Sequence, residues 1–318
     1  TITHNGYIKR TSLSTYRSQR RGGRGVQGAS SREEDFVEHL FVANTHSYIL
    51  FFTDKGKCYW VKVYDIPEGG RAAKGRAIVN LIGCEPDEKV SAFISVKEFN
   101  DDHYVVMATE KGMVKKTKLS AYSNPRKKGI YAVEIRDGDK LIEARVSTGD
   151  NDILLGTRNG KSIRFSEEQI RASGRKTMGV KGITLSSEDD RLVGMLLIKR
   201  EGTVLVATEK GFGKRTEISQ YRAQKRGGKG VLTMKTTDKV GKMVTIKEVV
   251  DKDDLMIITN QGVLIRLPVA QIRSIGRATQ GVKLIKLGEG TLVSSITRIM
   301  SEEEEDENNN TESTEPKE

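Results

Sequence analysis

One short signature recurs six times along this chain of 318 residues, and it constrains the fold more than any other feature of the sequence. The signature is Thr-x-x-Gly, its copies are about 50 residues apart, and its glycines are Gly6, Gly56, Gly112, Gly160, Gly211 and Gly262. A large apolar or aromatic residue stands ten positions after each of these glycines: Tyr16, Ile66, Tyr122, Ile170, Tyr221 and Ile272. A second glycine follows 17 to 19 positions after the first: Gly25, Gly75, Gly129, Gly179, Gly230 and Gly281. Three landmarks aligned in six segments indicate six structural repeats.

Each repeat has the pattern of a β-hairpin. A short β-type run precedes the threonine, for example at residues 48–52 and 104–108, and the glycine supplies the positive φ that a hairpin turn needs. The run that follows mixes basic with apolar residues, and no stretch sustains a helical period, so we predict an all-β fold. A repeat of this length fits one four-stranded blade, and six blades can close into a propeller-like disc. An open β-solenoid is the alternative, although the repeat is long for that architecture.

Charge divides the chain into two parts. The net charge is +11, but residues 301–318 carry nine acids against one lysine, so residues 1–300 carry +19. We expect a folded basic body over residues 1–300 and a disordered acidic tail over residues 301–318, because the tail has too little apolar surface to bury. A basic body favours a polyanionic partner, which could be a nucleic acid, a heparin-like sugar or an anionic membrane surface. Membrane is the weakest of the three, since no long apolar segment is present.

Cysteine usage and the start of the chain bear on its compartment. Cys58 and Cys84 have neither metal-ligand spacing nor the density of a disulfide framework, and the start does not resemble a signal peptide. We therefore expect a reducing cytoplasm. The chain begins without methionine, so we also expect it to be a fragment of a longer protein.

Two segments resemble nucleotide-binding motifs but lack the surrounding structural pattern that such motifs require. Residues 23–28 fit G-x-G-x-x-G, yet they follow a basic polar stretch and no βαβ unit is in view. Residues 156–162 resemble a P-loop that is one residue short, and Gly160 within them belongs to the repeated hairpin turn. We interpret neither as a nucleotide site.

Other polar residues have structural interpretations. The four histidines have no zinc spacing and are interpreted as surface residues: His4, His39, His46 and His103. Acid pairs at residues 101–102, 189–190 and 253–254 stand at a similar phase of their repeats and are interpreted as hairpin turns. Tyr16, Tyr122 and Tyr221 alternate with isoleucines at the same phase, which indicates core residues.

Basic clusters before the second glycine are the strongest candidates for function. They are Arg20, Arg21 and Arg24; Arg71, Lys74 and Arg76; Arg126, Lys127 and Lys128; Arg175 and Lys176; Lys225, Arg226 and Lys229; and Arg277. The same phase in every blade would place these cations on one rim of a disc, where their repulsion is unfavourable unless a polyanion is present. We therefore predict nucleic-acid binding. No recognition helix or aromatic ladder is offered to read bases, so the binding is expected to be independent of sequence.

Two other classes of function stay open from the residues alone. One is a propeller that serves as a protein-interaction platform for an acidic partner. The other is an enzyme with its site in the central channel, which would need polar residues repeated on the inner strands, and we find none.

The most concentrated basic cluster carries a family resemblance. The heptad Gln19, Arg20, Arg21, Gly22, Gly23, Arg24 and Gly25 resembles the signature box of the C-terminal domain of the bacterial DNA gyrase A subunit, with arginine at the sixth position where lysine is common. Residues 224–230 are a weaker copy of it. The resemblance covers residues 1 to about 300. It implies a six-bladed β-pinwheel whose blades exchange a strand, with DNA bent around the outer edge and the box between the first and last blades.

The resemblance also implies what lies outside the chain. The domain itself is non-catalytic and needs no cofactor or metal, whereas the rest of the enzyme uses ATP and Mg²⁺ to introduce negative supercoils. Its partners would be double-stranded DNA and, within an A2B2 assembly, the gyrase B subunit together with the breakage-reunion region of gyrase A, with no membrane involved. The isolated domain is expected to be monomeric and, in the bacterial cell, cytoplasmic and associated with the nucleoid. The related domain of topoisomerase IV lacks an intact box, so the heptad favours gyrase.

Overall fold

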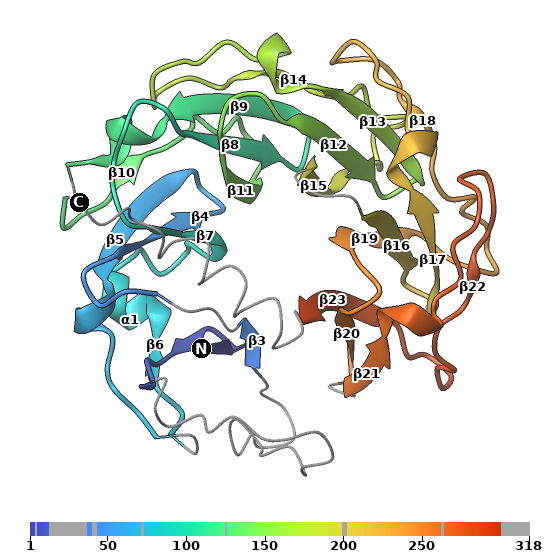
Figure 1. Ribbon diagram of the computed structural model, residues 1–318, viewed down its shortest axis with the longest axis horizontal. Coiled ribbons are helices and arrows are strands. Elements are labelled where there is room, and N and C mark those ends of the chain that lie inside the picture. Colours follow the sequence, from blue (N-terminus) through green and yellow to red (C-terminus); the bar gives the residue numbers. More distant parts are fainter. Residues whose placement is uncertain are drawn as a thin grey trace, which may run out of the picture. The chain divides into compact units, whose positions relative to one another are not determined.

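The computed structural model describes residues 1–3, 5–12, 37–39, 43–70, 73–124, 126–198, 202–261 and 264–299. They form six small antiparallel sheets, one for each repeat (Figure 1), which confirms the all-β fold class. The chain divides into two compact units. Unit 1 comprises Thr1–Asn151 and Ser166–Ile183, and unit 2 comprises Asp152–Phe165 and Thr184–Glu318.

Every sheet is built on the hairpin expected around the Thr-x-x-Gly signature. The first hairpin strands are β1 (Ile2–Thr3), β4 (Tyr48–Thr53), β8 (Tyr104–Thr109), β12 (Asp152–Thr157), β16 (Thr203–Thr208) and β20 (Asp254–Thr259). The second hairpin strands are β2 (Tyr7–Ile8), β5 (Lys57–Lys62), β9 (Met113–Lys118), β13 (Lys161–Ser166), β17 (Phe212–Glu217) and β21 (Leu264–Pro268). A third strand pairs with the first: β3 (Val37–His39), β7 (Val90–Val96), β11 (Leu141–Ser147), β15 (Leu192–Ile198), β19 (Met243–Val249) and β23 (Val293–Ile299).

The signature has a direct physical basis in the hairpin turn. In the second repeat the Gly56 amide donates to the Thr53 carbonyl at 2.9 Å, and the amide of Lys57 donates to Thr53 Oγ1 at 3.3 Å. Gly56 has φ +78°, and a Cβ there would lie 2.4 Å from the Val133 carbonyl oxygen. Threonine therefore accepts two amides at the start of the turn, and only glycine fits its end. Five of the six signature glycines lie in described residues with positive φ, as expected, whereas Gly262 lies outside them.

Short helical segments follow the hairpins. A single 3-10 turn follows the second strand in five repeats: η2 (Val63–Asp65), η3 (Leu119–Tyr122), η4 (Glu167–Gln169), η5 (Ile218–Gln220) and η6 (Val269–Gln271). The second repeat also contains the five-residue helix α1 (Ile78–Ile82), which ends at Gly83 in the left-handed conformation. Within the described residues, no helix is long and apolar enough to span a membrane.

The fourth strand of a sheet comes from the next repeat. These exchanged strands are β6 (Arg76–Ala77), β10 (Ile130–Tyr131), β14 (Val180–Lys181), β18 (Val231–Leu232) and β22 (Val282–Lys283). Each pairs with the second hairpin strand of the preceding repeat, for example β14 with β9 and β18 with β13. The exchange explains why residues 166–183 of the fourth repeat belong to unit 1, since β14 completes the sheet of the third repeat. Among the described residues the sixth sheet has three strands, in the order β21-β20-β23.

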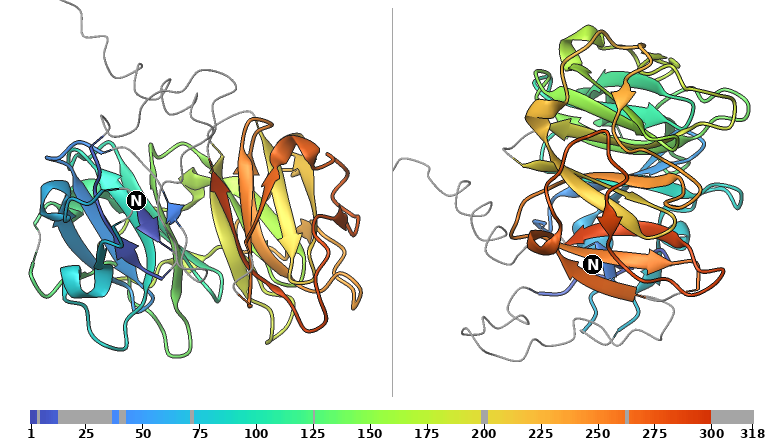
Figure 2. Two further views of the ribbon diagram at one scale, coloured as in Figure 1. Left: turned by 90° about the horizontal axis from the view of Figure 1, so that it is seen from below. Right: turned by 90° about the vertical axis from the view of Figure 1, so that its right-hand side faces the viewer.

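Within each unit, apolar side chains fill the spaces between neighbouring sheets. In unit 2, where Figure 2 shows the sheets of the fifth and sixth repeats stacked in yellow to red, Leu205 and Val249 pack with Leu255 and Ile296. The repeat landmarks lie in these cores and are at most 3% exposed: Ile66, Tyr122, Ile170, Tyr221 and Ile272. The interpretation of the tyrosines as core residues is therefore confirmed at two positions, and Tyr16 lies outside the described residues.

The interpretation of the acid pairs needs a correction. None of the three pairs forms a hairpin turn, because each lies at a connection between strands of different sheets. Asp101 and Asp102 lie in a bend between β7 and β8, and Asp253 ends the turn between β19 and β20, so these two pairs share a phase. Asp190, however, follows a turn before β15, which is the third strand of its sheet. It is 4% exposed and accepts from the amides of Asn159 and Ser186 at 2.9 and 3.1 Å. The error arose because short acidic turns look alike in sequence wherever they fall in the repeat.

Candidate nucleic-acid interface

In repeats two to six, the predicted cations that the structure describes lie between the 3-10 turn and the exchanged strand, with Arg76 as the first residue of β6. The structure describes five of these loops, and we call them the basic loops. Eight of their cations are exposed: Lys74, Arg76, Arg126, Lys127, Lys128, Lys176, Lys225 and Lys229. Arg175, Arg226 and Arg277 are half-buried. Gln19, Arg20, Arg21, Gly22, Gly23, Arg24, Gly25 and Arg71 lie outside the described residues, so their assignment stays a prediction from the sequence.

The second glycine fixes the end of each basic loop against the preceding repeat. Gly179 has φ +81°, and a Cβ there would lie 2.3 Å from the Val114 carbonyl oxygen. Gly230 has φ +70°, and its Cβ would lie 2.4 Å from the Ser162 carbonyl oxygen. No larger residue fits between the exchanged strand and its partner, so this landmark marks the strand exchange itself.

The fifth repeat shows how a copy of the heptad folds. The amide of Gln224 donates to the Arg164 carbonyl at 2.8 Å, which anchors the start of the loop. Thr184 then holds the glycine pair, because its hydroxyl donates to the Gly227 carbonyl at 2.7 Å and its amide to the Gly228 carbonyl at 2.9 Å. Between these fixed points Lys225 and Lys229 are exposed. The glycines thus allow a tight turn that carries cations outward.

The exposed loop cations are not neutralised within their own surroundings. Across the described ranges, none of these eight predicted cations forms an ion pair with an acid. Lys74 instead lies over the ring of Tyr7, with Nζ 4.0 Å from the ring centroid. Their positive field is therefore available to a partner.

Several cations on the second hairpin strands, or directly after them, have the opposite environment. Arg164 and Arg266 are paired with Asp152 and Asp254 at 2.6 and 2.5 Å. Arg10 is paired with Glu68 at 3.3 Å. These positive charges are balanced by acids of their own unit and contribute little to an external field.

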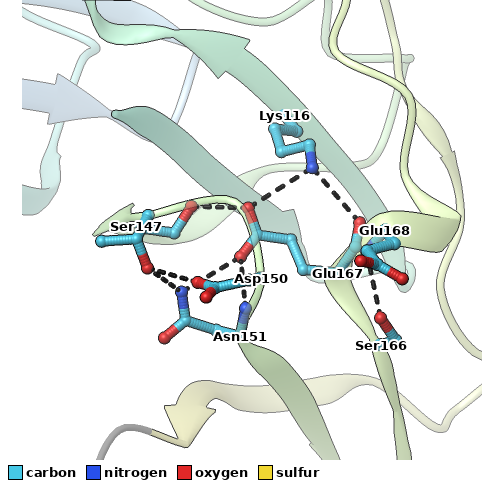
Figure 3. Close-up of polar contacts among 8 residues, drawn as sticks. Lys116, Ser147, Asp150, Asn151, Ser166, Glu167 and Glu168 are labelled. Carbon is cyan, nitrogen blue, oxygen red and sulfur yellow. Dashed lines mark hydrogen bonds and ion pairs between the residues drawn. The ribbon is translucent and has the colours of Figure 1, made fainter. Parts of the chain in front are cut away.

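The most enclosed of these strand pairs is shown in Figure 3. Glu167 is fully buried, and its Oε1 accepts from Ser147 Oγ at 2.5 Å and lies 3.5 Å from Lys116 Nζ. The amide and the side chain of Asn151 both donate to Oε2 at 3.4 Å. Lys116 also lies over the Tyr104 ring, 4.9 Å from the centroid. A carboxylate with this set of donors serves to join strands, and nothing about it requires catalysis.

Two half-buried loop arginines are partly engaged by the protein. Arg175 donates from Nη1 to the Tyr131 carbonyl at 3.2 Å, and Arg277 donates from Nη1 to the Leu232 carbonyl at 2.9 Å. Arg277 also lies over the Tyr221 ring, 6.0 Å from its centroid. Each guanidinium keeps further N–H groups for an external acceptor.

Sequence reasoning missed three buried lysines that contact the basic loops. Lys9, Lys115 and Lys214 are 4%, 1% and 0% exposed. Burial lowers the pKa of Lys115 to about 7, with Arg175 acting in the same direction and Glu134 against it. Burial, with Arg277 assisting, lowers the pKa of Lys214 to about 8. A signal was present in the sequence, since lysine stands three positions after the first glycine in repeats one, three and five alone.

Comparisons with known proteins agree with this architecture. A family model described as DNA gyrase C-terminal domain, beta-propeller, matches residues 1–44, 47–97, 103–148, 151–199, 202–249 and 253–299, which are the six repeats. The chain is 47% identical over 306 residues to the DNA gyrase A subunit of Staphylococcus epidermidis, a match covering 95% of this chain and 34% of that protein. The DNA gyrase A subunit of Staphylococcus aureus is 47% identical over 302 residues, covering 94% and 34%. The chain thus spans about a third of the length of these relatives.

Solved structures show the same fold. The crystal structure of the C-terminal domain of DNA topoisomerase IV superposes with a TM-score of 0.85 at 25% identity, covering 98% of this chain and 97% of that one. A structure of a DNA gyrase A C-terminal domain superposes with a TM-score of 0.73 at 24% identity, covering 94% and 98%. Together with the family match, these results confirm the expected six-bladed propeller class.

Proposed function

Because the chain belongs to the family of DNA gyrase C-terminal β-propeller domains, we propose that it binds duplex DNA without sequence preference and bends it along the basic loops. One observation carries the proposal. The loop cations, such as Lys127 and Lys128, are exposed without acidic partners among the described residues, whereas strand cations such as Lys116 and Arg164 are paired with acids. Unbalanced charge repeated at the same position of repeats two to five suits the regular spacing of phosphates in a duplex.

Bending DNA requires more favourable contact free energy from these loops than binding straight DNA does. DNA is stiff over about 150 base pairs, so a turn of a right angle or more costs on the order of several kcal/mol. A single cluster cannot offset that cost, but contacts distributed over six repeats can, since each repeat stabilises the bend that it imposes. We propose that the first-repeat residues Arg20, Arg21 and Arg24 provide one such set of contacts.

The activity of the larger enzyme follows as a further proposal. Joined to gyrase B and to the remaining two thirds of gyrase A, the domain would deliver a wrapped DNA segment to ATP-dependent strand passage and so support negative supercoiling. That places its work in the bacterial cytoplasm, on the nucleoid. The breakage chemistry would belong to the other parts of gyrase A.

A second candidate is a topoisomerase IV type of domain, which bends DNA and selects the topology of the substrate. The observation in its favour is the TM-score of 0.85 with the topoisomerase IV domain. Fold likeness alone is a weak guide to function, and the relatives at 47% identity are gyrase subunits. The two candidates differ in how far the bound DNA is wrapped, and the shift in linking number measures that wrapping.

The experiment closes a nicked circle with ligase in the presence of the 318-residue chain and measures the shift in linking number. We expect a shift that grows with protein concentration, and an affinity for short duplex that falls by orders of magnitude between about 50 and 200 mM salt. Arg126, Lys127 and Lys128 changed together to alanine should reduce the shift and lower the salt slope by about 3.

The matched control removes the same charge from the same unit at paired positions. It changes Lys55, Lys118 and Lys140 to alanine, which are bonded to Asp87, Asp101 and Glu110 at 3.0, 3.5 and 3.4 Å. The control should leave the salt slope nearly unchanged. Equal effects of the two triple variants would show that net charge, and not the basic loops, governs binding. A binding constant that is flat with salt would point instead to a protein-interaction platform.

A further inference from the structure

The three buried lysines alternate along the repeats. Lys9, Lys115 and Lys214 stand three positions after the first glycine of repeats one, three and five. The equivalent positions of repeats two, four and six hold Tyr59, Ile163 and Ile265. The odd repeats therefore bury an ammonium group at a position where the even repeats place a ring or an aliphatic side chain.

Each ammonium group donates to at least one backbone carbonyl of the basic loop of the next repeat. Lys9 Nζ lies 3.0 Å from the carbonyl oxygens of both Gly70 and Ala73. Lys115 Nζ donates to the carbonyl of Arg175 and, at 2.6 Å, to that of Ala132.

The fifth repeat repeats this arrangement in unit 2. Lys214 Nζ donates to the carbonyl of Gly276 at 2.7 Å, to that of Arg277, and to Thr279 Oγ1 at 3.1 Å. Three N–H donors therefore meet three acceptors within four residues of one loop. The arrangement in unit 1 is matched by an independent copy in unit 2.

In two pairs of repeats, three with four and five with six, an arginine of the even repeat donates a hydrogen bond back to the odd repeat. Arg175 of the fourth repeat donates to the Tyr131 carbonyl on β10 of the third, and Arg277 of the sixth repeat donates to the Leu232 carbonyl on β18 of the fifth. In both pairs the odd repeat holds the backbone of the even loop, and the cation of that loop reaches back to the strand from the odd repeat. The two contacts together define where the guanidinium points.

Filling space does not explain these lysines. A buried ammonium group loses its hydration, and the lowered pKa values of Lys115 and Lys214 reflect that cost. An apolar side chain of similar length would fill the same space without it. What the ammonium group supplies is three N–H donors, and in all three repeats at least one of them bonds a loop carbonyl that points inward. Inward carbonyls leave the side chains of the loop facing outward.

We propose that Lys9, Lys115 and Lys214 are positioning residues, which hold the basic loops of repeats two, four and six in the conformation that presents their cations to DNA. They do not contact DNA themselves, because they are buried. The effect of these lysines on DNA wrapping rests on the proposed function. Their role in ordering the loops does not. The odd-numbered loops are held differently, for example through Trp60 Nε1, which donates to the Tyr122 carbonyl at 2.8 Å.

The test uses Lys115→Met and Lys214→Met, singly and together, in the 318-residue chain. Without DNA, hydrogen exchange should accelerate at least tenfold in residues 173–178 of the first variant and 275–280 of the second. Exchange in the hairpin strands β8 and β16 should stay unchanged. With DNA, the double variant should lose most of the linking-number shift while its Kd for a short straight duplex rises less than threefold.

Two controls separate positioning from charge and from general destabilisation. Lys118→Met removes one positive charge from an exposed site on the same strand, and should alter neither exchange nor wrapping. Val105→Ala opens a fully buried core position on β8, and should lower Tm with the linking-number shift intact. The two lysines lie in different units, so failure of one variant to fold leaves the other as a complete test.

The outcomes distinguish this inference from the proposed function. Unchanged loop exchange in folded Lys115→Met and Lys214→Met would overturn the positioning role, whatever DNA does. Faster loop exchange with full wrapping would show that loop order does not matter for wrapping, and would also overturn it. A wild-type chain that fails to shift the linking number would refute the proposed function, while loop exchange would still report on the lysines.

Discussion

Basic residues on the loops and on the second hairpin strands share a charge but differ in what surrounds them. Lys127 and Lys128 are exposed and have no acidic partner among the described residues, whereas Arg164 lies 2.6 Å from Asp152 and is half-buried. Both kinds of residue recur at a fixed phase in several repeats. The difference teaches that position within the repeat, and not residue type, decides whether a positive charge is available to a partner.

The energetic roles of the two sets follow from this. A paired cation on a strand contributes at most modestly to stability and is screened by its partner. An unpaired cation on a loop repels its neighbours in the free protein, and that repulsion is relieved when phosphates approach. The strand cations therefore act mainly on stability, and the loop cations act mainly on binding of the partner. Substitutions in the two sets should have separate effects on these two quantities.

The largest effect is expected from the loop with the most arginines. Arg20, Arg21 and Arg24 changed together to alanine should abolish the linking-number shift, because removing the strongest anchor frees one end of the bent DNA. Straight duplex can still touch the other loops, so affinity should fall only modestly, with a salt slope smaller by about 3. The nicked-circle assay and a salt titration measure the two quantities.

The fifth repeat supplies the comparison for that variant. Lys225, Arg226 and Lys229 changed to alanine should have a milder effect on wrapping, since lysine offers a point charge where arginine offers a fork. A fifth-repeat variant more damaging than the first-repeat one would contradict the ranking of the loops.

The next effect concerns the strand set and should appear in stability alone. Glu167→Ala leaves Lys116 and Ser147 without their buried acceptor (Figure 3) and should lower the free energy of unfolding by about 3 kcal/mol. Urea unfolding measures this loss. DNA affinity of the folded variant should be unchanged. A variant that weakens DNA binding while keeping its stability would break the separation between the two sets.

The pH dependence of stability tests the buried lysines. The pKa of Lys115 is about 7 in the folded chain and lies near its ordinary value of 10.5 when the chain is unfolded, so between these values the unfolded state binds more protons. Stability should therefore rise with pH from about 7 to 10, by at most about 1.4 kcal/mol per pH unit, and the contribution should be flat below pH 7. Comparison of the free energy of unfolding of the wild type with that of Lys115→Met isolates this group. If the difference in free energy of unfolding between the two proteins is constant with pH, the pKa of Lys115 is not lowered in the folded chain.

The smallest effect is expected from the tail. Deletion of residues 301–318 removes nine acids tethered to a basic body, and should tighten DNA binding a few-fold at low salt by ending their competition for the loops. Titrations of the full and shortened chains against the same duplex at about 50 mM salt measure the change. Identical affinities would make the tail a solvated appendage. The tail lies outside the described residues, so this prediction comes from its sequence.

Local features of the fold were predictable because they depend on neighbours in the chain. The hairpins, the positive φ at Gly56 and Gly160, and the burial of Tyr122 and Ile170 follow from turn chemistry and from apolar landmarks at a fixed phase. The spacing also predicted that the basic clusters stand before the second glycine at one phase of the repeat, and the structure adds that a 3-10 turn precedes the described clusters and an exchanged strand follows them. Asp190 was misplaced because a turn can precede any strand, and the spacing did not fix which one.

The sequence by itself determined the number of repeats, the all-β class, the hairpin at each Thr-x-x-Gly and the set of residues that carry the positive charge. Only the tertiary structure decided which of those charges face outward. Whether Lys115 is buried and Lys127 exposed depends on the strand that the next repeat inserts and on the carbonyls that it brings, about 60 residues away along the chain. Pairing between distant segments is decided by the summed packing and hydrogen bonding of the whole sheet, and no local pattern of residues encodes that sum.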